Sequence, residues 1–269
     1  MSPVPMRPVL MRPVLKAEWT KLRTVSGPAW LLTAAAVATI AISLAAEAAT
    51  SCPARQTCPV DPVKLSLTGV QLGQAVVAIL AVLVVGNEYS SGLIKLTLAA
   101  MPRRIQVLGA KAAIVTALVL VAAAVAVAGS VLAGHLILPG HGFTAVRGFP
   151  VPSLAGGPSL RAAVGAVLYL GLIALLGLGV AAIVRDNAAA IGVVLGLLYL
   201  SPIVAAFVSN PVWHKRIESY APTNAGQAIF SATGLKHLPI SPWAGLGVLA
   251  IWAAAALLAG GLVLRLRDA

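Results

Sequence analysis

The two cysteines of the chain, Cys52 and Cys58, are the residues whose type and spacing most directly suggest a reaction. They lie in a loop that also holds Pro53, Pro59 and Pro62, where a disulfide could close a small ring. Such a bond persists in an oxidising compartment, and two free thiols are the alternative in a reducing one. Zinc is disfavoured, because no histidine or further cysteine stands nearby at the spacing of a zinc finger.

Other patterns that carry chemistry are missing from the sequence. There is no Gly-x-x-x-x-Gly-Lys-Ser/Thr phosphate loop, no His-Glu-x-x-His and no Gly-x-Ser-x-Gly. The histidines have no spacing typical of a metal site, and the long apolar runs are nearly free of ionisable residues. We therefore expect no catalytic residue, no metal and no cofactor in this chain. An intramembrane enzyme is disfavoured, because no run brings catalytic groups together.

Composition indicates the class of protein. Hydrophobic residues make up 59% of the chain and charged residues 10%, which leaves too little polar surface to cover a soluble fold. The net charge is +12, but the basic residues cluster at the ends of apolar runs rather than among aromatics, so anionic lipid headgroups are expected instead of nucleic acid. We expect an all-α polytopic protein of the cell (cytoplasmic) membrane.

Six apolar runs are long enough to cross a hydrocarbon core, which needs about 20 helical residues. A cytoplasmic segment at 1–27 precedes them and a short tail at 265–269 follows. Ala46-Glu47-Ala48 could pass for a signal-peptide cleavage site, but the first run is longer than a usual signal, which favours an uncleaved span. Basic residues favour a cytoplasmic location for both termini, with the cysteine loop outside. The predicted spans are about 28–46, 67–85, 108–138, 160–184, 188–208 and 243–264.

Two local patterns refine this outline. Leu15, Trp19 and Leu22 fall on one arc of a helix, which predicts an amphipathic interfacial helix before the first span. A basic anchor that only orients that span is the alternative. In the fifth span, Gly192 and Gly196 form a small-residue face that another helix can approach closely. Such spacings also arise by chance in a run rich in alanine and glycine.

The most distinctive polar interruption follows the second span. Glu88 and Ser90 suit the start of a short helix, where carboxylates and hydroxyls accept hydrogen bonds from free amides. Pro102 would end that helix, and Arg103 and Arg104 place positive charge before the next span. The pattern predicts an amphipathic elbow lying on a membrane face. An ordinary interfacial loop anchored by its arginines is the alternative.

Seven residues of this stretch carry a family resemblance: Glu88, Tyr89, Gly92, Lys95, Pro102, Arg103 and Arg104. Together with the Leu-Thr-Leu-Ala run at 96–99, they resemble the first cytoplasmic loop of type-2 ABC exporter permeases of the actinobacterial kind. In that family the loop is a coupling helix that docks into a groove of an ATP-binding cassette ATPase. The resemblance implies that Glu88 contacts a basic ATPase residue, that Tyr89 packs and that Gly92 allows close approach. The two arginines would anchor the loop.

Two further stretches resemble the same family. The Glu-Trp-Thr-Lys-Leu-Arg run at 18–23 resembles the amphipathic start of these permeases. The stretch at 220–229 resembles the Pro-x-x-Ala-Gly-x-Ala segment before the last span, which in the family forms short re-entrant helices above the exit path. An extracellular cap without a transport role is the alternative.

The resemblance implies a permease subunit that exports a drug-like, lipidic or amphiphilic compound. It would act as a homodimer with a second permease copy, or with a paralogue, and separate ATPase subunits would carry the ATP and Mg. ATP binding would close the ATPase pair, move the loop and shift the spans between inward-open and outward-open arrangements. A non-transporting membrane scaffold or immunity protein is the alternative.

Overall fold

The computed structural model describes residues 26–53, 58, 60–90, 104–144, 146, 148–149 and 151–266. Two sets of predicted site residues lie outside these ranges. They are Leu15, Trp19 and Leu22 of the interfacial helix, and Gly92, Lys95, Pro102 and Arg103 of the loop after the second span.

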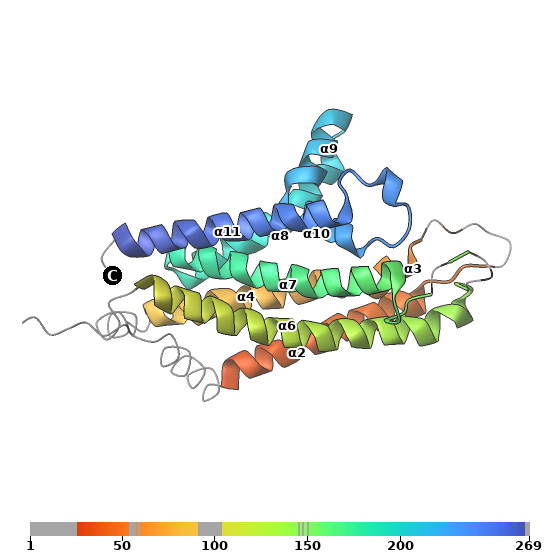
Figure 1. The fold of residues 1–269 in the computed structure, drawn as a ribbon, viewed down its shortest axis with the longest axis horizontal. Coiled ribbons are helices and arrows are strands. Elements are labelled where there is room, and N and C mark those ends of the chain that lie inside the picture. The colour runs from red at the N-terminus through yellow and green to blue at the C-terminus, as the bar shows by residue number, and fades with distance from the viewer. Residues whose placement is uncertain are drawn as a thin grey trace, which may run out of the picture.

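The regular structure of the described residues is helical throughout and is built on six long helices (Figure 1). Each of the six is long and apolar enough to cross a membrane. A helix suits this environment because it satisfies its backbone N–H and C=O groups internally. The chain is therefore an all-α polytopic membrane protein, as the composition predicts. The six helices are α2 (Ser26–Ala49), α4 (Val70–Ser90), α6 (Arg104–Ile137), α7 (Gly157–Val184), α8 (Asn187–Phe207) and α11 (Pro242–Leu266).

Short helices connect the long ones. Figure 1 shows α3 at the end of the bundle opposite the C-terminus, and α9 projecting from its side. We call these two ends the disulfide end and the C-terminal end. The short elements are α3 (Pro62–Ser66), η1 (Leu138–His141), α9 (Pro211–Tyr220), α10 (Pro222–Gln227), η3 (Ala228–Phe230) and η4 (Leu235–His237).

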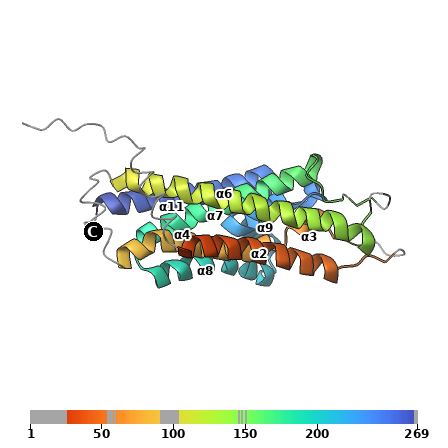
Figure 2. The same ribbon diagram turned by 90° about the horizontal axis from the view of Figure 1, so that it is seen from below.

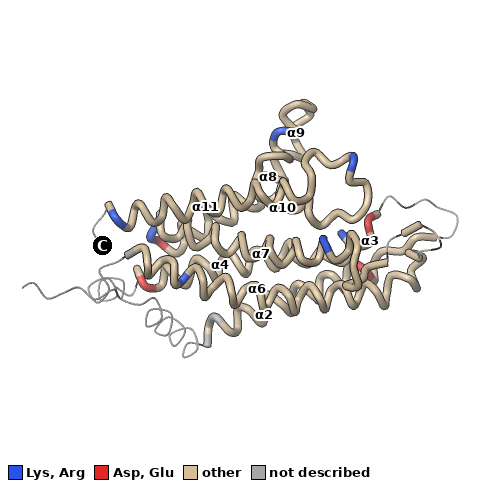
Figure 3. The backbone as a smooth tube through the Cα atoms, viewed as in Figure 1, with Lys and Arg blue, Asp and Glu red and all other residues tan. Residues whose placement is uncertain are grey.

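Helix α7 is the centre of the bundle. It packs against α4, α6, α8 and α11, and side chains such as Tyr169 and Ile173 are fully buried along it. Helix α2 lies on the outside against α4 and α6, on the near side in Figure 2. Charged residues gather toward the two ends of the bundle and are scarce in its middle (Figure 3). This distribution is the one that a low-dielectric membrane interior favours.

The structure corrects the predicted start of a helix at Glu88 and Ser90. Helix α4 continues without interruption through both residues, so they lie in its last turn. The apolar run before them has no proline to end the helix, and the carboxylate that would be unfavourable at a helix C-terminus has a cationic partner there.

Three ionisable residues are buried near the ends of the spans. Helix α2 extends beyond the predicted end at Ala46 and brings Glu47 into the bundle, where it is fully buried. Glu88 and Lys111 are also buried, at 8% and 4% exposure. Each of the three lies near a helix end, which agrees with the expectation that the span interiors are nearly free of ionisable groups.

Candidate functional site

Six polar side chains gather at the C-terminal end of the bundle. They come from the end of α4, from α6, and from the turn between α7 and α8. We call them the Glu88 cluster: Asn87, Glu88, Tyr89, Lys111, Arg185 and Asn187.

An ion pair between Glu88 and Lys111 is the centre of this cluster. Lys111 Nζ donates to Glu88 Oε1 at 2.7 Å, and both residues are buried. Glu88 lies in the last turn of α4 and Lys111 in the second turn of α6, so the pair joins the helices that precede and follow residues 91–103 in the sequence. Breaking a buried pair by removing one partner costs about 3–5 kcal/mol, because the remaining charge is left without compensation.

Arg185 extends the cluster to two further helices. It follows the last residue of α7 and has a φ of 63°, the left-handed conformation that often ends a helix. Its guanidinium carbon is 5.6 Å from the centre of the Tyr89 ring, within cation–π range, and its Nη2 donates to the carbonyl of Val263 at 3.0 Å. A single side chain therefore connects the ends of α4, α7 and α11.

The start of α8 is fixed to α4 by two asparagines. Asn187 Nδ2 donates to Asn87 Oδ1 at 2.9 Å, while Asp186 caps α8 by accepting from the Ala189 N–H at 2.8 Å. A Cβ at Gly86 would overlap the Asn187 side chain, so an alanine there would displace this side chain.

The cluster connects helix ends through direct side-chain contacts. Among the described residues there is no group of three or more His, Cys, Asp or Glu side chains that could hold a metal. The Glu88–Lys111 pair joins α4 to α6, and Arg185 with the asparagine pair adds α7, α8 and α11. The cluster is thus a junction between five helices.

The structure brings two of the seven predicted loop residues, Glu88 and Tyr89, into this junction, and α6 begins at Arg104. Glu88 was expected to meet a basic residue of a partner ATPase. Its basic partner in the structure is instead Lys111 of the same chain. Sequence reasoning missed Lys111 as a cluster residue. The available signal was a lysine within an apolar run, following a span that has a glutamate at its end.

Cys52 and Cys58, at the opposite end, are joined in a disulfide with their Cα atoms 6.0 Å apart. Cys52 is buried with Leu138 and Phe143, which lie in and just after η1. The disulfide closes a small ring within the loop after α2, and the packing of Cys52 holds this loop against the segment after α6.

Asp61 organises the same end with both carboxylate oxygens. Its Oδ1 caps α3 by accepting from the N–H groups of Val63 and Lys64, at 3.0 and 3.3 Å. Its Oδ2 accepts from the N–H groups of Ala232 and Thr233, at 2.6 and 2.8 Å. One side chain thus connects the first loop to the segment before the last span.

The stretch at 220–229, predicted to form short helices, spans the end of α9, all of α10 and the start of η3. Helix α10 packs against α8 and α11, and Thr223, Ala225, Gly226 and Ile229 are buried. A Cβ at Gly245 of α11 would overlap the Ala225 carbonyl, which shows how closely the two helices approach.

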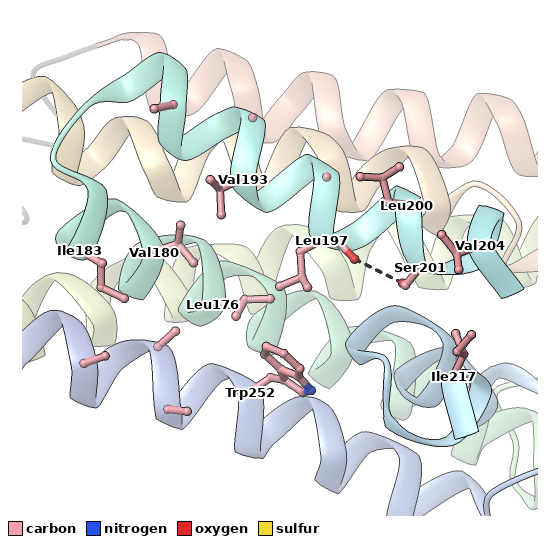
Figure 4. A pocket seen from close by; sticks show the side chains of 16 residues that line it. Leu176, Val180, Ile183, Val193, Leu197, Leu200, Ser201, Val204, Ile217 and Trp252 are labelled. Atoms are coloured by element: carbon pink, nitrogen blue, oxygen red, sulfur yellow. Dashed lines mark hydrogen bonds between the residues drawn. The ribbon is translucent and has the colours of Figure 1, made fainter. Parts of the chain in front are cut away.

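An open apolar groove of about 1160 Å³ lies between α7, α8 and α11 (Figure 4). Leu176, Leu197 and Trp252 line it from three different helices. Gly192 and Gly196 line it as well, so their predicted role in close helix packing is not met within the described chain. A Cβ at Gly192 would meet no atom within 4 Å. The small residues of α8 instead widen the groove.

The fold places the chain in the class of multi-pass α-helical membrane proteins, and the Glu88 cluster is its best-defined polar site. Comparison with known proteins adds no family. No protein-family model matches the chain, and no curated protein matches it with significant similarity.

Proposed function

We propose that the chain is the membrane-spanning permease subunit of an ABC transporter, an exporter located in the cell (cytoplasmic) membrane. The resemblance of the loop at 88–104 to the family's coupling helix supports the proposal. The observation that carries it is the Glu88 cluster, because a coupling loop must be rigidly joined to the spans that it moves. The Glu88–Lys111 pair joins both flanks of this loop, and Arg185 extends the connection to α7 and α11.

In the proposed mechanism the ATPase subunits belong to a separate chain and hold the ATP and Mg. Closure of the ATPase pair displaces the loop, and the cluster distributes that displacement over α4, α6, α7, α8 and α11. The coupling is then between a nucleotide site and a transport path through one two-state element. No catalytic residue is assigned to this chain.

The cargo class follows from the groove in this proposal. Its lining is almost entirely apolar, with Ser201 among its few polar members, which suits a drug-like, lipidic or amphiphilic compound. A second permease copy or a paralogue would complete the transporter, within the lipid bilayer and without nucleic acid. The second candidate, a non-transporting scaffold or immunity protein, needs no ATPase, and this difference separates the two.

Photo-cross-linking in the native membrane distinguishes them. We expect a photo-reactive residue at position 95, inside the loop, to form a light-dependent adduct with a soluble protein that carries a phosphate-loop motif. The same residue at position 213, on α9, is the control and should give no such adduct. An efficiently incorporated probe at several loop positions that never captures an ATPase would count against the permease.

A further inference from the structure

Helix α2 contacts the rest of the bundle along one narrow stripe. Its buried residues recur every fourth position, and all other described positions of the helix are at least partly exposed. The stripe runs from apolar to increasingly polar residues: Ala35, Thr39, Ser43 and Glu47. Apolar burial provides little driving force between helices in lipid, so this contact depends on close packing and hydrogen bonds.

The facing surface is built to let α2 approach closely. A Cβ at Gly69 would overlap the backbone carbonyl of Thr39, and the Gly69 N–H donates to Ser43 Oγ at 3.1 Å. On α6, a Cβ at Gly134 would meet Ser66 Oγ and lie 2.7 Å from Glu47 Oε1. The carboxyl group of Glu47 is thus enclosed between α2, α3 and α6.

Glu47 differs from the other buried glutamate in having no cationic partner among the described residues. It is 0% exposed, and neither carboxylate oxygen has a hydrogen-bond partner among the described residues. The nearest polar side chain, Ser66, donates its hydroxyl hydrogen to the carbonyl of Pro62 at 3.1 Å. Glu88, by contrast, has Lys111 at 2.7 Å.

No charged group on the neighbouring elements pairs with Glu47 in the described chain. Lys64 of α3 is exposed, and Asp61 is engaged with backbone N–H groups. On α6, His135 is exposed with its ring hydrogen-bonded to the Pro152 carbonyl, and His141 of η1 forms no hydrogen bond or ion pair with Glu47 in the described chain. Glu88 and Lys111 are paired at the other end. Arg55 lies outside the described residues.

We infer that Glu47 is a proton-binding site inside the membrane, held as a neutral carboxylic acid while α2 is docked on α3 and α6. An unpaired carboxylate in a site that excludes water costs far more free energy than its protonated form. The protonated form can also donate to the free lone pair of Ser66 Oγ, which continues the hydrogen-bond chain to Pro62. Loss of the proton would require α2 to separate or a counter-ion to enter. This inference does not depend on the proposed function.

Infrared spectroscopy of the full chain in lipid nanodiscs tests the site directly. We expect the carbonyl stretch of a protonated carboxylic acid at neutral pH, independent of sodium concentration and lost in Glu47→Gln. Glu88→Gln and Glu218→Gln are the controls and should leave the band unchanged. The wild-type spectrum alone overturns the inference if it has no such band at neutral pH. An ionised Glu47 paired with Arg55, or carboxylate bands that respond to sodium, would give that result.

The same substitution at the two buried glutamates supplies a second measurement. Glu47→Gln replaces a neutral acid by a neutral amide of the same shape, so its thermal unfolding temperature in detergent should equal or exceed that of the wild type. Glu88→Gln leaves Lys111 buried without its counter-charge and should unfold at a lower temperature. Comparable destabilisation by both variants would show that Glu47 is ionised, and would overturn the inference.

Discussion

At the scale of single residues, the account depends on the pairing of Glu88 with Lys111 rather than on Glu88 alone. The family resemblance implies a contact from Glu88 to a partner ATPase, whereas the structure directs the carboxylate into the bundle. The two assignments differ in what a charge exchange would do. An internal pair survives the exchange of its two members, but a contact with another protein does not.

We therefore predict that Glu88→Lys destabilises the chain and that adding Lys111→Glu restores most of the loss. The single variant places two cations together in a buried site, and the loss of a buried pair costs about 3–5 kcal/mol. Thermal unfolding in detergent should show a clear drop for Glu88→Lys and for Lys111→Glu, and recovery in the double variant. A double variant as unstable as the singles would show that the internal pair is not what positions Glu88.

The sequence alone could not have predicted this pairing. The sequence shows that Glu88 and Lys111 are charged residues near span ends. The pattern around each residue, however, describes only the helix to which it belongs. Their contact depends on how α4 and α6 return to the same end of the bundle after a loop. Glu47 was missed for a related reason, since its place beside Ala46 and Ala48 resembled a cleavage site, and only the neighbouring α3 and α6 show that it is enclosed.

At the scale of helices, glycines that look alike in the sequence have different surroundings. Gly69 lies against the Thr39 carbonyl of α2, whereas Gly192 faces an open groove. The small-residue face predicted on α8 lines an open groove. The close helix contact is made instead by glycines that face α2, which were not predicted. Spacing reveals where a helix could approach, and the packing of the other helices decides where one does.

Gly69→Ala should displace α2, since the new methyl group would overlap a backbone carbonyl that cannot rotate away. We expect a lower unfolding temperature and faster protease cleavage in the segment before α3. Gly192→Ala is the matched control, because its methyl group enters open space and alanine favours a helix by up to about 1 kcal/mol. Equal stability of the two variants would contradict the packing described for α2.

The six spans were predictable because apolar run length is a direct requirement of the membrane. The ends of the spans were harder to predict, because α2 and α4 both continue past the predicted boundary and include a glutamate. In a sequence, a polar residue near the end of an apolar run suggests that the chain has reached the water interface. In the folded protein, an oppositely charged partner or a bound proton can keep such a residue buried in the bundle. The short helices at 211–230 were predictable in kind, but not their close contact with α8 and α11.

At the scale of the whole molecule, the bundle is a set of spans joined at two ends by different means. At the disulfide end, the Cys52–Cys58 bond closes a ring within one loop and Asp61 bridges two loops. At the C-terminal end, the side chains of the Glu88 cluster connect the helices.

The central claim is that this chain works with a separate ATPase, and co-purification tests it most directly. The chain would be tagged at its C-terminus, extracted from its native membrane in mild detergents and analysed by mass spectrometry. We predict a stoichiometric soluble protein with a phosphate-loop motif, retained by the Glu88→Lys, Lys111→Glu double variant and lost when Lys95→Glu reverses charge in the loop. Recovery of the chain alone from several detergents, with no ATPase at any level, would contradict the account and favour the scaffold.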